Sequence, residues 1–265
     1  MVRCGPSVPF TISEPVTSQP ITKPFLKPLS ETAMPASMKQ FAAADQGFSL
    51  ISNRKLLALY TAMLACRQLA EAASQTNRAT RSADSIHGHE AAVVGAAIDL
   101  QPHDTVAHAL WPEGTMQIVN PSTALAASYA AATRSALAAA APGKVIVLLS
   151  SARRSAQAAW TAAITLAAEH NLPALFIQMR HPKSAAESFR VDSIELKRKR
   201  YTLPSINVDG SDVVAMYRVA TESITHARKG HGPSFIDCRL SIAADPLRNM
   251  QDYLVGKGLD RAAFE

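Results

Sequence analysis

Two runs of apolar residues in the middle of the chain, 145–149 and 174–179, are continuous rather than alternating. Such runs are typical of strands that are buried on both faces of a sheet. Between them Trp160, Ile164 and Ala167 recur at helical spacing, and a leucine-proline pair ends this helix just before the second run. The order strand, helix, strand predicts two parallel strands joined by a right-handed crossover.

The pattern of apolar and polar positions predicts further helices and strands on both sides of this unit. The elements predicted before it are a helix that begins near Ser52-Asn53, a helix at 88–100, a short strand at 105–110 and an alanine-rich helix from Asn120-Pro121 to Pro142-Gly143. The elements predicted after it are strands at 206–208 and 235–240, a helix at 213–228 and a last helix that begins at Asp245-Pro246. Strands that alternate with helices predict an α/β fold, a doubly wound and mostly parallel sheet flanked by helices.

Prolines divide the chain into two parts. Residues 1–45 contain seven prolines, which interrupt helices and central strands. We therefore predict that residues 1–45 form a flexible tail outside the core and that residues 46–265 form a single domain. With 265 residues, 48% of them hydrophobic, one α/β domain is a sufficient account of the chain.

Charge and cysteine content argue against several classes of protein. The net charge is +6, but the basic residues are scattered, and the one dense run, 197–200, has no aromatic platform beside it, so we predict no nucleic-acid binding. No apolar run reaches the length of a membrane span and no signal peptide begins the chain, so we predict a cytoplasmic protein without membrane contact. Three cysteines without paired spacing predict neither a disulfide framework nor a zinc site, and Cys66 and Cys238 are predicted to be buried free thiols.

The topology predicts a ligand site at the loop after the strand at 145–149. In doubly wound sheets ligands bind at the carboxyl ends of the strands. Such a loop usually has glycine, which lets the backbone approach a ligand, or a carboxylate that binds a metal. This loop instead holds Ser150, Ser151, Ala152, Arg153 and Arg154. The sequence therefore predicts the scaffold of a binding site without its usual chemistry.

Four segments, 56–71, 88–106, 145–177 and 201–239, together resemble one family. The last of them combines a Val-Asp-Gly-x-Asp-Val turn with a Gly-x-Gly-Pro sequence before a strand, a specific pairing. The chain resembles the alpha subunit of the thiamin-diphosphate-dependent dehydrogenase component of 2-oxoacid dehydrogenase complexes, the pyruvate and branched-chain type. The resemblance implies a thiamin-diphosphate-binding fold, thiamin diphosphate with magnesium as cofactor, and a beta subunit as partner.

The departures from this family lie where it carries out its chemistry. The family's Gly-Asp-Gly motif falls at residues 151–153, which puts Ala152 at the position of the magnesium-ligating aspartate. The Asn-Gln-Gly motif falls at residues 156–158, and the second side-chain ligand falls at His181. Magnesium prefers oxygen ligands, which alanine and histidine do not supply. We therefore predict no metal site and no catalytic residue in this chain.

Two further segments of the family are absent or changed. The resemblance implies a long segment with diphosphate-binding and entry-channel residues before Asn120, but only a short connection stands there. It also implies a histidine-rich loop after the last strand, whereas Arg239 leads directly through residues 240–244 to Asp245 without a histidine. The retained Asp209 to Asp212 turn has a structural explanation, a tight turn followed by a helix cap. Glu90 is predicted to be an interface or capping carboxylate.

Three hypotheses for function follow. The leading one is a catalytically degenerate relative, a pseudoenzyme that keeps the fold and a subunit interface with itself, as a homo-oligomer, or with a beta-like dehydrogenase subunit, and that does not bind the cofactor alone. The second is an active thiamin-diphosphate-dependent oxidoreductase subunit that decarboxylates a 2-oxoacid together with a beta subunit. Its cofactor-binding residues would be Arg153, Arg154 and Gln157, since guanidinium groups and a helix N-terminus both favour a diphosphate. The third is a sensor that binds a phosphorylated ligand without turnover.

Overall fold

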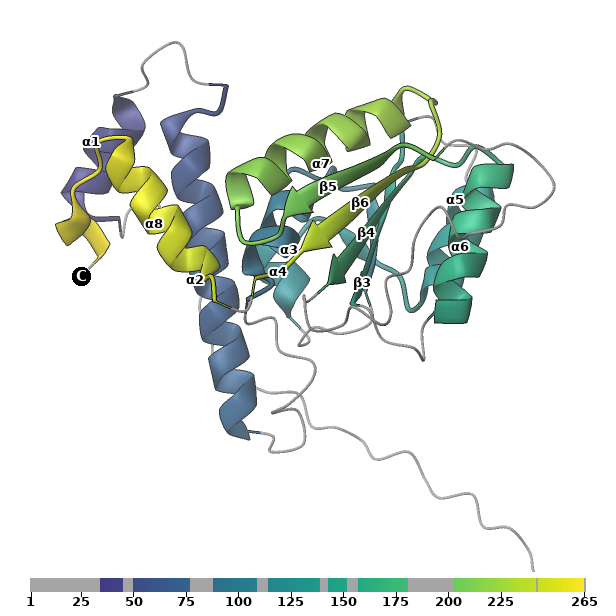
Figure 1. Cartoon of the computed structure of the whole chain (residues 1–265), viewed down its shortest axis with the longest axis horizontal. Coiled ribbons are helices and arrows are strands. Elements are labelled where there is room, and N and C mark those ends of the chain that lie inside the picture. The colour runs from purple at the N-terminus through teal and green to yellow at the C-terminus, as the bar shows by residue number, and fades with distance from the viewer. Residues whose placement is uncertain are drawn as a thin grey trace, which may run out of the picture.

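A six-stranded sheet forms the centre of the molecule (Figure 1). The computed structural model describes residues 34–44, 50–76, 88–108, 114–138, 143–151, 157–180, 203–241 and 243–264. The strands are β1 (Thr105–His108), β2 (Ala124–Leu125), β3 (Ile146–Ser151), β4 (Ala174–Arg180), β5 (Ser205–Asp209) and β6 (Ser234–Arg239). They lie in the order β2-β1-β3-β4-β6-β5, and every described pair is parallel. The predicted doubly wound parallel sheet is therefore confirmed.

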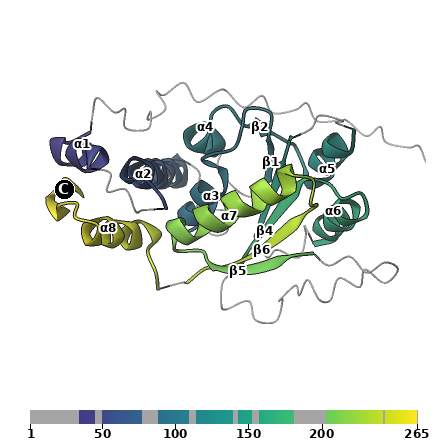
Figure 2. The ribbon, with the colours of Figure 1, turned by 90° about the horizontal axis from the view of Figure 1, so that it is seen from above.

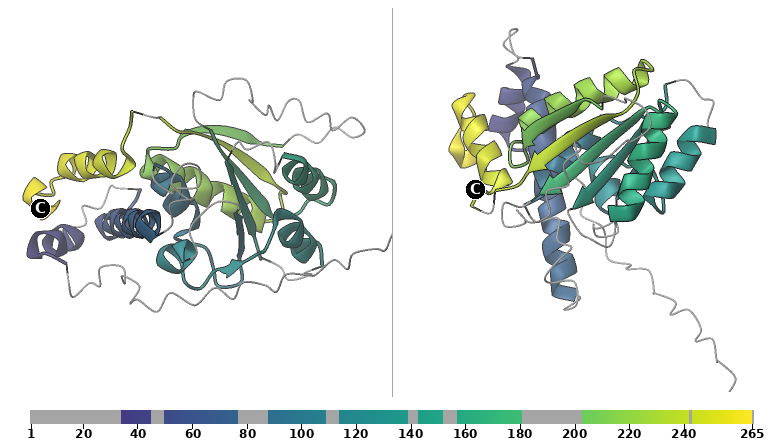
Figure 3. Two further views of the ribbon diagram at one scale, coloured as in Figure 1. Left: turned by 90° about the horizontal axis from the view of Figure 1, so that it is seen from below. Right: turned by 45° about the vertical axis from the view of Figure 1, so that its right-hand side comes forward.

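Helices cover both faces of this sheet. They are α1 (Ala36–Ala43), α2 (Asn53–Thr76), α3 (Glu90–Ala97), α4 (Thr115–Val119), α5 (Tyr129–Ala138), α6 (Gln157–Glu169), α7 (Val213–Arg228) and α8 (Pro246–Gly256), followed by a 3-10 turn at Arg261–Phe264. Figure 2 shows α5 and α6 on one side of the sheet and α3, α4 and α7 on the other. Helices α1, α2 and α8 lie together outside the second group (Figure 3). Among the described helices, none has both the length and the apolar character needed to cross a membrane.

Alternate side chains of the central strands enter two separate cores. Leu148, Phe176 and Phe235 face α5 and α6 and pack with Trp160, whereas Val147 and its neighbours on the other face pack toward α3 and α7. All of these side chains are at most 2% exposed. Because both faces are covered, the strands are apolar throughout, which is why they appear in the sequence as continuous runs.

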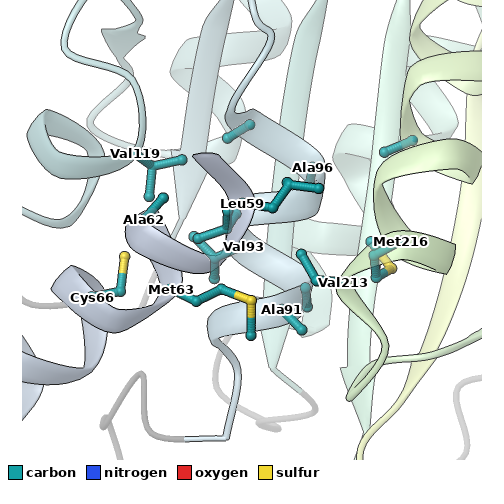
Figure 4. Close-up of a cluster of buried hydrophobic side chains, with 14 of the residues drawn as sticks. Leu59, Ala62, Met63, Cys66, Ala91, Val93, Ala96, Val119, Val213 and Met216 are labelled. Carbon is teal, nitrogen blue, oxygen red and sulfur yellow. The ribbon is translucent and has the colours of Figure 1, made fainter. Parts of the chain in front are cut away.

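Helix α3 packs unusually close to α7. All eight residues of α3 are buried, and most of them are alanine, valine or glycine (Figure 4). A Cβ atom added at Gly95 would lie 2.8 Å from Cβ of Met216 and 2.9 Å from the backbone nitrogen of Tyr217. The small residues of this segment thus allow the backbones to approach.

The predicted helix caps are present. The Ser52 hydroxyl accepts a hydrogen bond from the Lys55 amide at 3.2 Å, at the start of α2. The Asp212 carboxylate accepts from the first turn of α7 at 2.9 and 3.0 Å, and the Asp245 carboxylate accepts from the Leu247 amide at 3.0 Å, at the start of α8. Side-chain acceptors at these positions satisfy amides that have no partner within the helix, so the three helices begin where the sequence predicts.

The prediction of one alanine-rich helix from Asn120 to Gly143 is wrong. Asn120 follows α4, residues 124–125 form the edge strand β2, and helix begins again only at Tyr129. The Asn120 amide donates to the carbonyl oxygens of Ala97 and Leu100, at 3.1 and 2.8 Å, and so closes the end of α3 instead of opening a helix. The amides of Ala124 and Ala126 donate to the carbonyl oxygens of Asp104, just before β1, and of Val106, at 3.2 and 2.8 Å. Strand pairing here overrides the helix propensity of alanine.

The prediction that residues 1–45 lie outside the core is wrong for helix α1. Met38 and Phe41 are 3% and 7% exposed and belong to the core on the α3 and α7 side. The Asn53 side chain donates to the carbonyl oxygens of Phe41 and Ala44, at 3.0 and 3.1 Å, which fixes α1 to the start of α2. Residues 1–33 lie outside the described part of the chain.

Candidate functional site

The carboxyl edge of the sheet is the candidate site. The chain passes from β1 to its neighbour β2 and then crosses to β3 on the other side, so the direction of winding changes between β1 and β3. Ligands of doubly wound folds bind at the carboxyl ends of the strands at such a point. The strands end there at His108, Ser151, Arg180 and Arg239.

Three buried polar residues cross the sheet just before this edge. Ser150, Gln178 and Asp237 are in register on β3, β4 and β6, and they are 4%, 5% and 7% exposed. They lie on the same face as Leu148 and Phe176, which point toward α5 and α6. The Oε1 atom of Gln178 is buried and has no hydrogen-bond partner. A buried acceptor in this state is uncommon.

Aromatic side chains from α5 and α6 pack on the same face of the sheet as this polar row. The ring of Trp160 lies edge-to-face against Tyr129 and Phe176, with centroids 5.1 and 5.3 Å apart. The Tyr129 hydroxyl donates to the carbonyl oxygen of Leu149 at 2.7 Å. Burial raises the pKa of Tyr129, and a hydrogen bond with Ser150 partly opposes this. The hydroxyl is therefore a neutral donor at the end of β3.

An ion pair joins β4 to β6 at the edge. The Arg180 guanidinium donates from Nε to Oδ1 of Asp237 at 2.6 Å and from Nη2 to Oδ2 of the same carboxylate. The two side chains are 19% and 10% exposed. Nε of Arg239 lies 3.8 Å from Oδ2 of Asp237, but its side chain is 68% exposed. The bidentate geometry orients Arg180 rigidly, because both donors are fixed by one planar acceptor.

These groups do not fit a magnesium ion. Magnesium takes oxygen ligands in octahedral geometry, and Asp237 already holds Arg180 with both of its oxygens. His108 at the end of β1 offers ring nitrogens and no oxygen, and burial lowers its pKa. Within the described ranges, no three histidine, cysteine, aspartate or glutamate side chains gather closely enough to hold a metal.

Comparison with known proteins identifies the family of the chain. The family described as Dehydrogenase E1 component matches residues 108–240, about half of the chain, from the end of β1 to the end of β6. The chain belongs to this family. The E1 component family is thiamin-diphosphate dependent, and its fold agrees with the sheet described above.

Individual relatives of this E1 component chain match shorter stretches. The alpha subunit of acetoin:2,6-dichlorophenolindophenol oxidoreductase of Bacillus subtilis (strain 168) is 39% identical over 79 residues, which are 28% of this chain and 24% of that protein. The pyruvate dehydrogenase E1 component subunit alpha of Porphyra purpurea is 35% identical over 100 residues, which are 35% of this chain and 27% of that protein. Subunit alpha-3 of the chloroplastic pyruvate dehydrogenase E1 component of Arabidopsis thaliana is 31% identical over 83 residues, 28% and 18% of the two chains. The matched stretches thus span between 18% and 27% of the length of these relatives.

The site residues predicted from the sequence are outside the described residues or have side chains that are not described. Arg153 and Arg154 fall between β3 and α6, outside the described residues, as do Ala152 and His181. Gln157 is the first residue of α6, and its side chain is not described. A role of Arg153, Arg154 and Gln157 in cofactor binding in this E1 component chain therefore stays a prediction.

Glu90 has a structural role within the chain. Its Oε1 accepts from Nε of Arg67 at 2.8 Å, and its Oε2 accepts from the amide of Gly88 at 2.8 Å. Arg67 also pairs with Asp245, so one guanidinium connects α2, α3 and α8. The Gly88 amide precedes α3, so a capping role of Glu90 stays a prediction, whereas Cys66 and Cys238 are buried free thiols as predicted. A subunit-interface role of Glu90 stays a prediction.

Sequence reasoning did not identify Arg180, Gln178 or Asp237. A signal for them exists, because each is a polar residue in a strand that is otherwise apolar. Polar residues in doubly buried strands need partners, and their presence indicates an internal network or a site. The pairing itself joins residues 57 positions apart and requires the strand order β4-β6.

Proposed function

We propose that this chain is a catalytically degenerate alpha-type subunit of the E1 dehydrogenase family that is non-catalytic by itself and depends on a partner subunit. The observation that carries the proposal is the charge at the carboxyl edge. Arg180 engages both oxygens of Asp237, so this carboxylate offers magnesium no free oxygen, and the arginine itself is positively charged.

The strand boundaries support this assignment. β3 ends at Ser151 and β4 ends at Arg180. Ala152 and His181 are therefore the first residues after these strands, where the family resemblance puts the two side-chain ligands of the metal. Neither residue offers the oxygen atom that magnesium prefers.

The proposed partner is a beta-like dehydrogenase subunit or a second copy of this chain. The relatives that match this chain are named as alpha subunits. The matched region includes β3, α6 and β4, the region in which the family resemblance locates the cofactor. A subunit that retained its fold and its contacts but lost its metal would regulate or stabilise an assembly rather than add a second active site.

Native mass spectrometry of the tagged protein, isolated gently from its own cells, tests this proposal. A cofactor-free complex, either a homo-oligomer or one with a beta-like subunit, is the expected result. A catalytically intact E1 assembly purified in the same buffer shows that thiamin diphosphate survives the procedure. A complex of this chain that retains thiamin diphosphate would overturn the proposal and favour an active 2-oxoacid dehydrogenase subunit, with Arg153 and Arg154 as the first residues to substitute.

A further inference from the structure

We infer that His226 and His231 bind one divalent transition-metal ion of the nickel, copper or zinc type, with water in the remaining coordination positions. The two residues lie where α7 ends and the chain leads into β6, at the amino ends of the strands and so at the opposite edge from the candidate site. The inference does not depend on the proposed function of the chain. It rests on the distance between the two rings, on the turn that holds them together and on the charges around them.

The two imidazole rings lie at the separation that a shared metal ion requires. Their centroids are 4.8 Å apart, and their planes are tilted by 38°. With metal–nitrogen bonds of about 2.0–2.1 Å, two imidazoles at neighbouring positions around one ion have centroids roughly 4.5–5.2 Å apart. The observed separation falls within this range. The backbone therefore already places the two rings as a two-histidine metal site needs them.

The turn between the two histidines keeps them together. His226 lies in the last turn of α7, and the amide of His231 donates to the carbonyl oxygen of His226 at 3.3 Å. Gly230 has a φ of 82°, a left-handed conformation that ends the helix and returns the chain toward it. The Asn171 side chain, from the turn before β4, donates to the carbonyl oxygen of Gly230 at 2.9 Å. A site held in this way loses little conformational entropy when it binds an ion.

The His226 ring has a nitrogen that no described protein group uses. Its Nδ1 atom is buried and has no hydrogen-bond partner among the described residues. Buried polar atoms nearly always have a partner, and neutral imidazole is a common metal ligand. His231 is exposed, so an ion with its bound waters can approach the pair from the side of this ring.

The charges around the pair are compatible with a cation. The carboxyl end of a helix carries a partial negative charge, and the pair lies at this end of α7. Glu222, one turn before His226, adds a carboxylate on the same side of the helix. Of the two basic residues that follow, Arg228 is paired with the buried Asp104, and Lys229 is exposed to solvent. The helix end and Glu222 thus oppose the repulsion from these two residues.

Two neutral imidazoles select the kind of ion. Imidazole suits nickel, copper and zinc, whereas magnesium prefers carboxylate, carbonyl and water oxygens. No third histidine, cysteine, aspartate or glutamate joins the pair within the part of the chain that the structure describes, so water completes the coordination. The pair should therefore bind Ni²⁺ reversibly and should not bind Mg²⁺.

Isothermal titration calorimetry of the full chain, produced without a polyhistidine tag, tests this with Ni²⁺ as the probe. The natural chain should bind Ni²⁺, and an excess of Mg²⁺ should not displace it. Absence of Ni²⁺ binding, or displacement of Ni²⁺ by Mg²⁺ at a similar concentration, would each overturn the inference.

Two single variants and one control assign the ion to the pair. His231→Ala and His226→Gln should each weaken Ni²⁺ binding at least about tenfold, a loss that is typical even when only a group that orients a metal ligand is removed. His231 is exposed, so its substitution keeps the test decisive if His226→Gln does not fold. His103→Ala is the matched control, because His103 is an exposed histidine just before β1, which β3 and β4 separate from β6. This control should bind Ni²⁺ as the natural chain does, and equal affinity in His231→Ala would overturn the inference.

Thermal unfolding gives a second readout. An ion that binds only the folded chain stabilises it, so Ni²⁺ should raise the Tm of the natural chain and of His103→Ala more than that of His231→Ala. An equal rise in all three would place the ion elsewhere and overturn the inference. Neither measurement involves thiamin diphosphate, so failure of the histidine pair to bind Ni²⁺ leaves the proposed function untouched.

Discussion

Replacing Gly95 by alanine should destabilise the protein, because α3 has no room for a methyl group where it crosses α7. The added Cβ would lie 2.8 Å from Cβ of Met216, 2.9 Å from the amide nitrogen of Tyr217 and 3.2 Å from the carbonyl carbon of Met216. None of these atoms is the end of a flexible side chain. The two helices would have to separate by several tenths of an ångström at a contact where all of α3 and the Met216 side chain are buried.

The expected magnitude follows from two opposing terms. Overpacking a well-packed core costs about 1–3 kcal/mol. Alanine in place of glycine inside a helix returns roughly 0.5–1 kcal/mol. The two terms together leave a loss of about 0–2.5 kcal/mol in the free energy of unfolding. The close backbone contact at Tyr217 puts Gly95→Ala in the upper part of this range, at about 1–2.5 kcal/mol.

Urea unfolding followed by circular dichroism measures this difference. Gly256→Ala is the matched control, because Gly256 lies at the end of helix α8 with nothing within 4 Å of the added Cβ. That variant should be as stable as the natural chain or more stable by up to about 1 kcal/mol. If Gly95→Ala unfolds at the same urea concentration as the natural chain or at a higher one, the close approach of α3 and α7 does not limit the packing, and the reasoning is refuted.

Three other predictions concern buried polar groups. Asp104→Ala should lower the free energy of unfolding in urea by about 3 kcal/mol, because this buried carboxylate accepts from the Val145 amide at 2.9 Å and pairs with Arg228 at 2.8 Å. A loss below about 1 kcal/mol would contradict this prediction. Burial lowers the pKa of His108 below its usual 6.5, so the unfolded chain takes up a proton that the folded chain does not; stability should therefore fall as the pH drops below about 6.5, and His108→Phe should remove this part of the pH dependence. Burial, and to a smaller extent the charge of Glu90, raises the pKa of the Cys66 thiol to about 12. Iodoacetamide at about pH 8 should therefore label this thiol only after unfolding, which peptide mass spectrometry would show. Labelling in the native protein would be evidence against the buried position.

The central part of the fold is predictable from the sequence because burial on both faces determines its composition. A strand covered by helices on each side must be apolar throughout, so β3 and β4 appear as continuous runs. Helix α7 is predicted to the residue because its Asp212 cap and its C-terminal Gly230, with φ of 82°, are local signals. Signals of this kind do not depend on the rest of the molecule.

The errors arise where distant contacts decide the local structure. Asn120 has the appearance of a helix start, but its amide is used by carbonyl groups at the end of α3. β2 has only two residues and exists because it pairs with β1. The helix that contains Phe41 lies in a proline-containing segment, where only its contact with the core reveals it. Local propensity contains no information about such partners.

The candidate site, like the fold, is predictable from the sequence only in part. Its position at the carboxyl edge follows from the order of strands and helices, which the sequence predicts. Its content does not follow, because the Arg180–Asp237 pair depends on β6 lying between β4 and β5. The sequence pattern does not predict that order, because β5 precedes β6 along the chain, whereas β6 is the strand that pairs with β4.

The side-chain hydrogen bonds that hold the sheet and α3 together lie away from the carboxyl edge, where the family's chemistry takes place. Asp104 ties the amino ends of β1 and β3 together, and Asn120 closes α3 just before β1 begins. Substitutions at the carboxyl edge leave both untouched, so a chain of this family can lose metal ligands and keep its sheet. A bound cofactor stabilises only the folded state, and its loss removes that contribution. Under the proposed function, no cofactor stabilises the carboxyl ends of the strands. The bidentate pair of Arg180 and Asp237 joins β4 to β6 at that place.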